Sequence, residues 1–244
     1  MAQNPRAPSY LPLVRAVAYG LRHRAAVPEG GHLLVACSGG ADSVALLRAL
    51  GLLHRRRKWN LTLSVAHVQH HLRPPDAAEG DAASVEHLAE QLGLAYHRRD
   101  IAPGDTPGNT EANAREQRYA ALHQIARDIH APFVATAHHA DDQLETLLMA
   151  ILRGTTAKGL RGIAWTRPLG PRVQLIRPML GATRAEAVEL LEHLGQSWRE
   201  DATNRDPSRT RARLRHEVLP VLRELRPSVA RKALELSEAL RKDY

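Results

Sequence analysis

Hydrophobic residues along the chain alternate between short continuous runs and longer stretches with helical spacing. Four runs of strand length lie at 32–37, 61–66, 94–101 and 132–137. Each is followed by a segment in which apolar residues recur every three or four positions, near 42–57, 77–93, 110–131 and 140–153. Repeated strand–helix units predict a doubly wound α/β fold, in which helices cover both faces of a parallel sheet.

The pattern differs at both ends of this region. Residues 9–24 predict an amphipathic helix. After a basic, Gly-containing loop at 153–161, whose movement could gate a pocket, "RVQLIRP" predicts a short strand, and helices are expected at 183–195, 208–219 and 228–243. Thr183 and Glu186 have the spacing of a capping box. We therefore expect an N-terminal helix over 1–30, a main α/β domain over 31–180 and a helical extension over 181–244.

Composition limits the classes of protein to consider. With 244 residues and 43% hydrophobic content, the chain can form one sizeable core. Cys37 is the single cysteine, which excludes an intramolecular disulfide and a metal site built from several cysteines. No apolar run is long enough to span a bilayer, so we expect a soluble cytoplasmic protein without membrane contact.

The chain is strongly basic. Lysine and arginine total 34 against 26 acidic residues, for a formal charge of +8, which favours a polyanionic partner such as nucleic acid. An arginine-rich composition inherited from a genome of high G+C content is the alternative explanation.

The segment Ser38-Gly39-Gly40-Ala41-Asp42-Ser43 joins the first strand to the next helix. Free backbone N–H groups and the positive end of a helix dipole would form an anion site there. Asp42 suits such a site only when a cation bridges it to phosphate, which points to a nucleotide with Mg²⁺. An ordinary tight turn with an acidic N-cap is the structural alternative. The loop matches neither a Walker A motif nor a GxGxxG fingerprint.

A second motif, "VATAHHADDQLETLL" at 134–148, places a strand end at His138 and His139 and a helix start at Ala140. Asp142 and Glu145 are three apart, so they share a helix face and could clamp an ammonium group. Favourable placement of acids at a helix N-terminus, or a His/Asp metal centre, are the alternatives.

These motifs resemble known enzymes. SGGxDS resembles the pyrophosphate loop of the N-type ATP pyrophosphatases, which have an adenine nucleotide alpha hydrolase-like, Rossmann-like fold and cut ATP between its α- and β-phosphates. "AHVQHHLR" at 66–73, "AREQRY" at 114–119, HHxDDQxET, "IRPML" at 176–180 and "RTRARLRHEVLP" at 209–220 are similar to tRNA(Ile)-lysidine synthetases, in the same order along the chain.

The resemblance implies ATP-dependent joining of free L-lysine to C2 of the wobble cytidine in a tRNA(Ile) with a CAU anticodon. ATP first adenylates the C2 oxygen and releases pyrophosphate, and the lysine ε-amine then expels AMP. Asp42, His138 or a water could accept the lysine proton. Mg²⁺ is expected at Asp42, and a homodimer is implied as well.

The resemblance also assigns residues. The expected ATP-binding residues are Ala36, Ser38, Gly39, Gly40, Asp42, Ser43 and His67. Asp42, Arg115 and His138 are the expected catalytic residues, and Asp142 with Glu145 is the expected lysine-binding pair. The expected tRNA-binding residues are Lys158, Arg161, Arg209, Arg211, Arg213 and Arg215.

Two rival functions remain open at this stage. One is a tRNA thiolase of the same superfamily, which would have to rely on Cys37 alone. The other is a nucleotide- or RNA-binding relative without turnover, suggested by three departures from the family pattern at Gln69, His71 and Ala212. Enzymes of this kind often carry a further C-terminal tRNA-binding region, of which this chain would contain at most the beginning.

Overall fold

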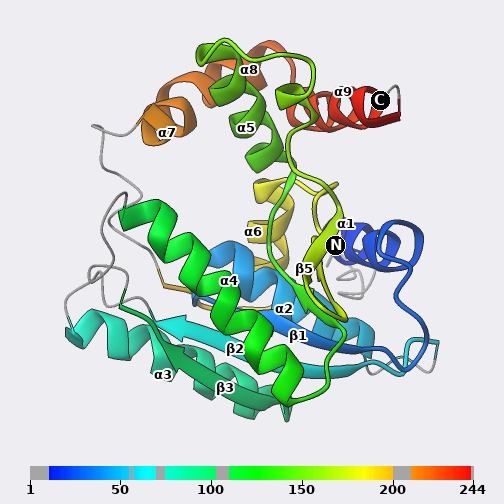
Figure 1. Ribbon diagram of the computed structural model, residues 1–244, viewed down its shortest axis with the longest axis vertical. Coiled ribbons are helices and arrows are strands. Elements are labelled where there is room, and N and C mark those ends of the chain that lie inside the picture. Colours follow the sequence, from blue (N-terminus) through cyan, green and yellow to red (C-terminus); the bar gives the residue numbers. More distant parts are fainter. Residues whose placement is uncertain are drawn as a thin grey trace, which may run out of the picture.

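A computed structural model of the chain contains a six-stranded sheet with helices on both faces (Figure 1). The structure describes residues 11–54, 56, 58–69, 75–102, 110–199 and 210–242. The strands are β1 (His32–Ala36), β2 (Thr62–Gln69), β3 (Ala95–Asp100), β4 (Phe133–Ala135), β5 (Thr166–Gly170) and β6 (Val173–Ile176). Their order is β3-β2-β1-β4-β6-β5, and all neighbours are parallel except the β5–β6 pair. The predicted doubly wound fold is confirmed.

Helices cover the two faces because side chains alternate along the strands. Leu33 and Val35 of β1 belong to the core cluster on one face, whereas Leu34 belongs to the cluster on the other. The first face packs against α1 (Pro12–Tyr19), η2 (Gly20–Arg24), α2 (Ala41–His54), α3 (Pro75–Leu92) and α6 (Arg184–His193). The second face packs against α4 (Thr110–Asp128).

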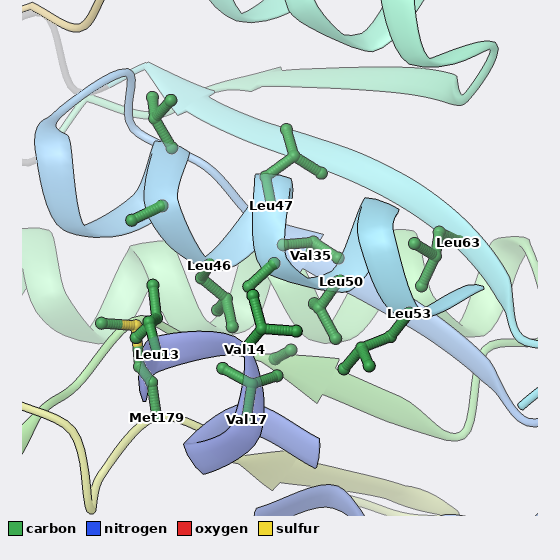
Figure 2. Close-up of a cluster of buried hydrophobic side chains, with 14 of the residues drawn as sticks. Leu13, Val14, Val17, Val35, Leu46, Leu47, Leu50, Leu53, Leu63 and Met179 are labelled. Atoms are coloured by element: carbon green, nitrogen blue, oxygen red, sulfur yellow. The ribbon is translucent and has the colours of Figure 1, made fainter. Parts of the chain in front are cut away.

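Helix α2 is apolar on nearly all sides because it is enclosed between the sheet and α1. Leu46, Leu47 and Leu50 are fully buried, and Figure 2 shows Leu46 and Leu50 lying between α2 and the side chains of α1, among them Val14 and Val17. The turn that begins α2 therefore rests on a rigid element.

The strand order reverses between β1 and β4. β1 pairs with β2 on one side and with β4 on the other, and β4 pairs in turn with β6, so the chain continues from β1 and from β4 to strands on opposite sides. In open α/β sheets this reversal creates a crevice at the carboxyl ends of the strands. Ser38–Ser43 follows β1 and His138–His139 follows β4, so both motifs reach this crevice.

A group of helices lies beyond this edge of the sheet, at the top of Figure 1. It consists of α5 (Ala140–Leu152), α7 (Thr210–Arg213), η6 (Leu214–Val218), α8 (Leu219–Leu225) and α9 (Val229–Lys242). Leu144, Leu147, Leu214 and Leu219 share its apolar core. Within the described part of the chain, no helix combines the length and apolar character needed to cross a membrane.

Several boundaries differ from the sequence predictions. β2 continues to Gln69, so His67 lies inside a strand, and β5 was not predicted at all. The helix expected at 208–219 continues to Leu225, because Pro220 sits in the first turn of α8, where no N–H is needed. The loop at 153–161 ends in a short turn, η4 (Gly159–Arg161), where the Leu160 C=O accepts a bond from the Ser237 hydroxyl at 3.3 Å. The predicted capping box of Thr183 and Glu186 is present.

Replacing Leu50 by Ala should lower the free energy of unfolding by about 2–5 kcal/mol, because the fully buried side chain leaves a cavity between α1 and α2. Urea unfolding followed by circular dichroism measures this. Leu236→Ala is the matched control, since that side chain is 52% exposed on α9 and its loss should change stability by only about 0.5 kcal/mol. Equal effects of the two substitutions would contradict the packing described here.

Candidate active site

The loop after β1 is a tight turn held by two hydroxyl groups. The Ser38 N–H donates to Ser43 Oγ at 3.1 Å, and the Ser43 hydroxyl donates to the Gly40 C=O at 2.9 Å. Gly39 has φ +87°, a backbone conformation that residues with a side chain rarely adopt. Among the described residues, no acceptor satisfies the backbone N–H groups of residues 40–42. These groups lie at the N-terminus of α2, so the turn can bind an anion with its backbone.

Asp42 lies in the first turn of α2 and has one engaged and one free oxygen. Its Oδ2 is 3.5 Å from both His139 Nε2 and Arg184 Nη1. Its Oδ1 is buried and has no hydrogen-bond partner in the described chain. Burial raises the pKa of Asp42, but the hydrogen bond to His139 and the charges of His139, Arg184 and Arg215 outweigh it and lower the pKa overall. Asp42 is therefore a carboxylate within an anion-binding turn.

A divalent cation fits this carboxylate. Mg²⁺ binds through one or two protein carboxylates together with substrate phosphates, and the free Oδ1 of Asp42 offers such a ligand. The described residues contain no group of three or more His, Cys, Asp or Glu side chains able to hold a metal by themselves. A site completed by phosphate oxygens is the arrangement that suits Asp42.

His139 is buried among three carboxylates. Its ring nitrogens lie 3.5 Å from Asp42 Oδ2 and 3.6 Å from Asp141 Oδ2 and Asp142 Oδ2. Burial lowers the pKa of His139, but the three carboxylates outweigh it and raise the pKa to about 9. The ring is thus a cation at neutral pH. Its Nδ1 then carries a proton, so the 3.4 Å contact from the Asp142 N–H is not a hydrogen bond in that state.

Asp141 ties the start of α5 to two other helices. Its Oδ2 accepts a bond from the Arg184 N–H at 2.7 Å, at the start of α6. Its Oδ1 accepts one from Arg223 Nη2 of α8 at 2.9 Å. These bonds, together with the Asp142 side chain that accepts from the His139 N–H at 3.0 Å, fix the first turn of α5.

His138 is a neutral base at the carboxyl end of β4. Its Nδ1 lies 3.0 Å from Thr136 Oγ1. Burial holds the pKa of His138 well below its usual value, and the positive charges of Arg177, Arg118 and Arg115 lower it further. The two adjacent histidines therefore differ in charge at neutral pH, because only His139 is surrounded by carboxylates.

The structure brings Asp142 and Glu145 together, as their spacing predicts, but it places a guanidinium between them. Arg215 donates from Nε to Glu145 Oε1 at 2.6 Å, and its Nη2 lies 3.6 Å from Asp142 Oδ1. Arg211 Nε lies 4.0 Å from Glu145 Oε2. Glu145 is only 3% exposed. Asp142 and Glu145, here called the acid pair, can therefore hold a cationic group, and in this structure the guanidinium of Arg215 in η6 is that group.

Two cavities adjoin at this point. The smaller one, about 210 Å³, is lined by loop residues including Ser38, Asp42 and Ser43 and by apolar residues including Ala36, Ala66 and Leu122. The larger one, about 900 Å³, is lined by the acid pair and by arginines from α4, β5, α7 and η6. His138 and Asp142 line both cavities.

His67 takes a different position from that expected of a loop residue. It is buried inside β2, and its Nδ1 donates to the Cys37 C=O at 3.0 Å, so it supports the start of the loop. Its Nε2 lies 2.9 Å from Gln69 Oε1, at the end of the same strand. His67 lines neither of the two cavities described above. His71 lies outside the described residues.

The expected tRNA-binding residues that the structure describes lie on the helical group and at the adjacent turn η4. Lys158 is exposed, and the Arg161 C=O accepts a bond from Arg241. Exposed Arg213 pairs with Glu217 at 3.0 Å, whereas Arg211 and Arg215 face the acid pair. Arg209 lies outside the described residues. Ala212 is buried and lines the larger cavity.

Some contacts of the site join residues that are far apart in the sequence. Arg199 donates its N–H to the Gly39 C=O at 3.0 Å and its Nε to Asp81 Oδ1 at 2.6 Å, which joins the loop to α3. Arg167 and Arg177 line the larger cavity. Arg177 lies within the "IRPML" motif, which therefore signalled it, whereas Arg167 belongs to the unpredicted strand β5.

Comparisons with known proteins show which family this chain resembles. The family model for the PP-loop domain matches residues 16–222. A tRNA(Ile)-lysidine synthase from Synechococcus sp. is 39% identical over 220 residues, which are 90% of this chain and 66% of the relative. One from Gloeobacter violaceus is 42% identical over 200 residues, 81% of this chain and 59% of the relative. One from Bacillus cereus is 40% identical over 215 residues, 86% and 44% of the two chains.

The chain thus spans between 44% and 66% of the length of these relatives. Among solved structures, the U34-tRNA thiolase NcsA from Methanococcus maripaludis, with its [4Fe-4S] cluster, has a TM-score of 0.75 at 18% identity. The match covers 95% of this chain and 78% of that one. At this identity the likeness shows the shared fold.

The charge on His139 should make stability depend on pH. Its pKa is raised from 6.5 to about 9 in the folded state, so its contribution is complete below pH 6.5 and is lost as pH rises towards 9. The loss amounts to at most about 3 kcal/mol. Urea unfolding at pH 6, 7.5 and 9 should show this decline in the wild type and not in His139→Asn, whose uncharged side chain can cap α5 at every pH. Exposed His193→Asn serves as the control, and an unchanged decline in His139→Asn would contradict the assignment.

Proposed function

The chain belongs to the PP-loop domain family, and from this we propose that it acts as a tRNA(Ile)-lysidine synthetase. It would join L-lysine to C2 of the wobble cytidine in a tRNA(Ile) with a CAU anticodon, with ATP as the activating substrate and AMP and pyrophosphate as products. One observation carries the proposal: His138 and Asp142 line both the loop cavity and the larger, arginine-rich cavity.

The loop cavity suits ATP. The backbone N–H groups at the start of α2, with the hydroxyls of Ser38 and Ser43, would bind phosphate oxygens, while Ala66 and Leu122 offer an apolar wall for the nucleoside. Asp42 Oδ1 would hold Mg²⁺, which, when bound, stabilises negative charge on the departing pyrophosphate. Among the expected ATP-binding residues, His67 would act from behind the loop, through the Cys37 C=O.

The reaction would proceed in two displacements. The C2 oxygen of cytidine attacks the α-phosphorus, and the bond to the β-phosphate oxygen breaks to release pyrophosphate. The ε-nitrogen of lysine then bonds to C2, and AMP leaves with the former C2 oxygen. His138 is uncharged at neutral pH and lies between the two cavities, so we assign it the proton that the lysine ammonium must lose.

The acid pair suits the amino-acid substrate. Asp142 and Glu145 contact two different nitrogens of the Arg215 guanidinium in this structure. An ammonium group of lysine, which carries three N–H donors, can make charged contacts with both carboxylates. Lysine would therefore take the place of Arg215 between the two carboxylates. The released Arg215 would face the larger cavity, where a polynucleotide phosphate can pair with it.

The RNA would enter from the helical group. Arg211 and Arg213 lie there, Lys158 and Arg161 lie at the adjacent turn η4, and the net charge of +8 favours a polyanion. In this arrangement residues 31–180 supply the nucleotide chemistry and 181–244 contribute RNA contacts. We also infer a cytoplasmic location, since tRNA is modified there, while the expected homodimer stays a prediction.

A sulfur-transfer function is less well supported. Cys37 is the single cysteine of the chain, it is buried, and burial raises the pKa of its thiol above the usual value, which disfavours the reactive thiolate. A non-catalytic nucleotide- or RNA-binding role needs no neutral base between two cavities, so His138 favours turnover.

The direct test is incubation of the chain with ATP, radiolabelled lysine and the CAU-anticodon tRNA. Lysine should appear in the tRNA, with one AMP released for each lysine. Binding of ATP and tRNA without AMP release would instead support the non-catalytic role and would overturn the proposal.

Asp142→Asn should raise KM for lysine about 10-fold or more, because one charged contact to the ammonium group is lost. KM for ATP should change by less than about 2-fold, since asparagine preserves the cap of α5. Steady-state kinetics measures both constants. Exposed Glu189→Gln on α6 removes the same charge at a distance and should leave both unchanged. A parallel rise of the two constants would contradict a lysine-specific role.

Arg215→Gln should lower KM for lysine several-fold, because the cation that occupies the acid pair is removed. KM for tRNA should rise in the same variant, since one phosphate-pairing group is lost. Arg226→Gln, which removes an exposed arginine after α8, is the control. An increase in KM for lysine would mean that Arg215 holds the amino acid and does not compete with it.

A further inference from the structure

Guanidinium groups from three elements gather around the ring of Tyr119. The Cζ atoms of Arg115 and Arg118, both on α4, lie 5.2 and 5.3 Å from the ring centroid. Arg167 of β5 lies closer, at 4.6 Å. Arg177, which follows β6, completes the cluster, because its charge acts on Tyr119 and is in turn affected by Arg167 and Arg115. We call these four arginines the Tyr119 arginine cluster.

Within the described part of the chain, the cluster has no carboxylate partner. Among the described residues, no carboxylate lies within salt-bridge distance of any of its four arginines. Arg177 is only 4% exposed, and although its Nη1 donates to the Ala164 C=O at 2.6 Å, its Nε is buried without a partner. The Nε of Arg118 is likewise buried and unpartnered within the described chain. Burial raises the pKa of the Tyr119 hydroxyl, but the nearby Arg118, Arg115 and Arg177 outweigh burial and lower the pKa overall.

Such an arrangement is unfavourable in the absence of a ligand. Burial lowers the pKa of Arg177, and the charges of Arg167 and Arg115 act in the same direction, whereas the contact with Tyr119 opposes them without reversing the shift. Cation–π contact with one tyrosine ring offsets only part of this repulsion. An anion with several oxygens would relieve it and would satisfy the free N–H donors, because guanidinium groups bind such anions through paired hydrogen bonds.

The position of the cluster indicates which anion it binds. Arg115, Arg167 and Arg177 line the larger cavity, together with the acid pair and His138. The residues of the phosphate-binding loop line the smaller cavity instead, where Arg118 is the one member of the cluster present. The cluster therefore lies on the side from which the second substrate enters, across His138 from the loop.

We propose that the Tyr119 arginine cluster binds a backbone phosphate of the RNA substrate next to the base that reacts. This rests on the proposed function, and it adds Arg167 and Arg177 as residues that position the RNA. The bound phosphate fixes the register of the strand, so that the adjacent base reaches the neighbourhood of His138. Since arginines cover the Tyr119 ring, this ring does not serve as a stacking platform for a base.

The test compares two arginines of the same hairpin. Arg167→Gln removes a charge from the cluster, whereas Arg172→Gln removes an exposed charge from the β5–β6 turn. Binding of a fluorescent anticodon stem-loop RNA with the CAU sequence is measured by anisotropy over a range of salt concentrations. Arg167→Gln should raise Kd about 5- to 10-fold and reduce the slope of log K against log salt by about 0.7–0.9 relative to Arg172→Gln.

Arg177→Lys keeps the charge and loses the planar fork. It should weaken RNA binding with a nearly unchanged salt slope, and circular dichroism confirms that the variant is folded. Equal RNA binding by Arg167→Gln and Arg172→Gln overturns the proposal. Normal RNA binding by Arg167→Gln or Arg177→Lys, together with a raised KM for ATP or weaker inhibition by pyrophosphate, also overturns it. The latter result assigns the cluster to the pyrophosphate.

The two proposals fail in different ways. Equal RNA binding by Arg167→Gln and Arg172→Gln counts against the phosphate subsite alone. RNA binding with the expected salt effect, but without lysine incorporation by the wild type, counts against the synthetase function and supports the subsite.

Discussion

The buried imidazolium of His139 holds the charged part of the site together. It draws Asp42 of α2, and Asp141 and Asp142 of α5, to within 3.6 Å of one ring, although the two helices start from different strands. Without a positive charge at this position, three carboxylates would share a buried space and repel one another. The orientation of the free oxygen of Asp42, the first turn of α5 and the acid pair all depend on this one group.

The sheet makes this meeting of charges possible. Because the strand order reverses between β1 and β4, the segments that follow these two strands open a crevice rather than packing against each other. Polar residues at this edge then find partners across the crevice, and the apolar core below remains undisturbed. Two adjacent histidines in one sequence motif consequently reach opposite protonation states, since one faces carboxylates and the other faces arginines.

Much of the fold could be predicted from the sequence, because strand runs and helical spacing are local signals. Helices α2 to α5 and the strands they connect follow directly from apolar periodicity, and the capping box follows from the spacing of Thr183 and Glu186. β5 escaped prediction because its residues, Thr166–Gly170, contain a proline and a glycine and become a strand through pairing with β6. Tertiary contact, and not local preference, determines that element.

The candidate site was predictable to a lesser extent. Spacing alone placed Asp142 and Glu145 on one helix face, and parallel strand ends placed the loop near His138. The occupant of the acid pair could not be foreseen, since Arg215 is 70 residues from Glu145 and nothing local links them. The same holds for Arg199, whose contact with Gly39 spans more than half of the chain. Partnerships between distant charges depend on how the helical group folds back over the sheet.

The wall shared by the two cavities has a kinetic consequence for the proposed reaction. An adenylated cytidine is an activated intermediate that water can destroy, and each such loss would waste one ATP. With His138 and Asp142 common to both cavities, the intermediate is exposed to the amine in the place where it forms. Commitment to product would then depend on whether lysine is already in position when the base is activated, which makes the order of substrate arrival a determinant of efficiency.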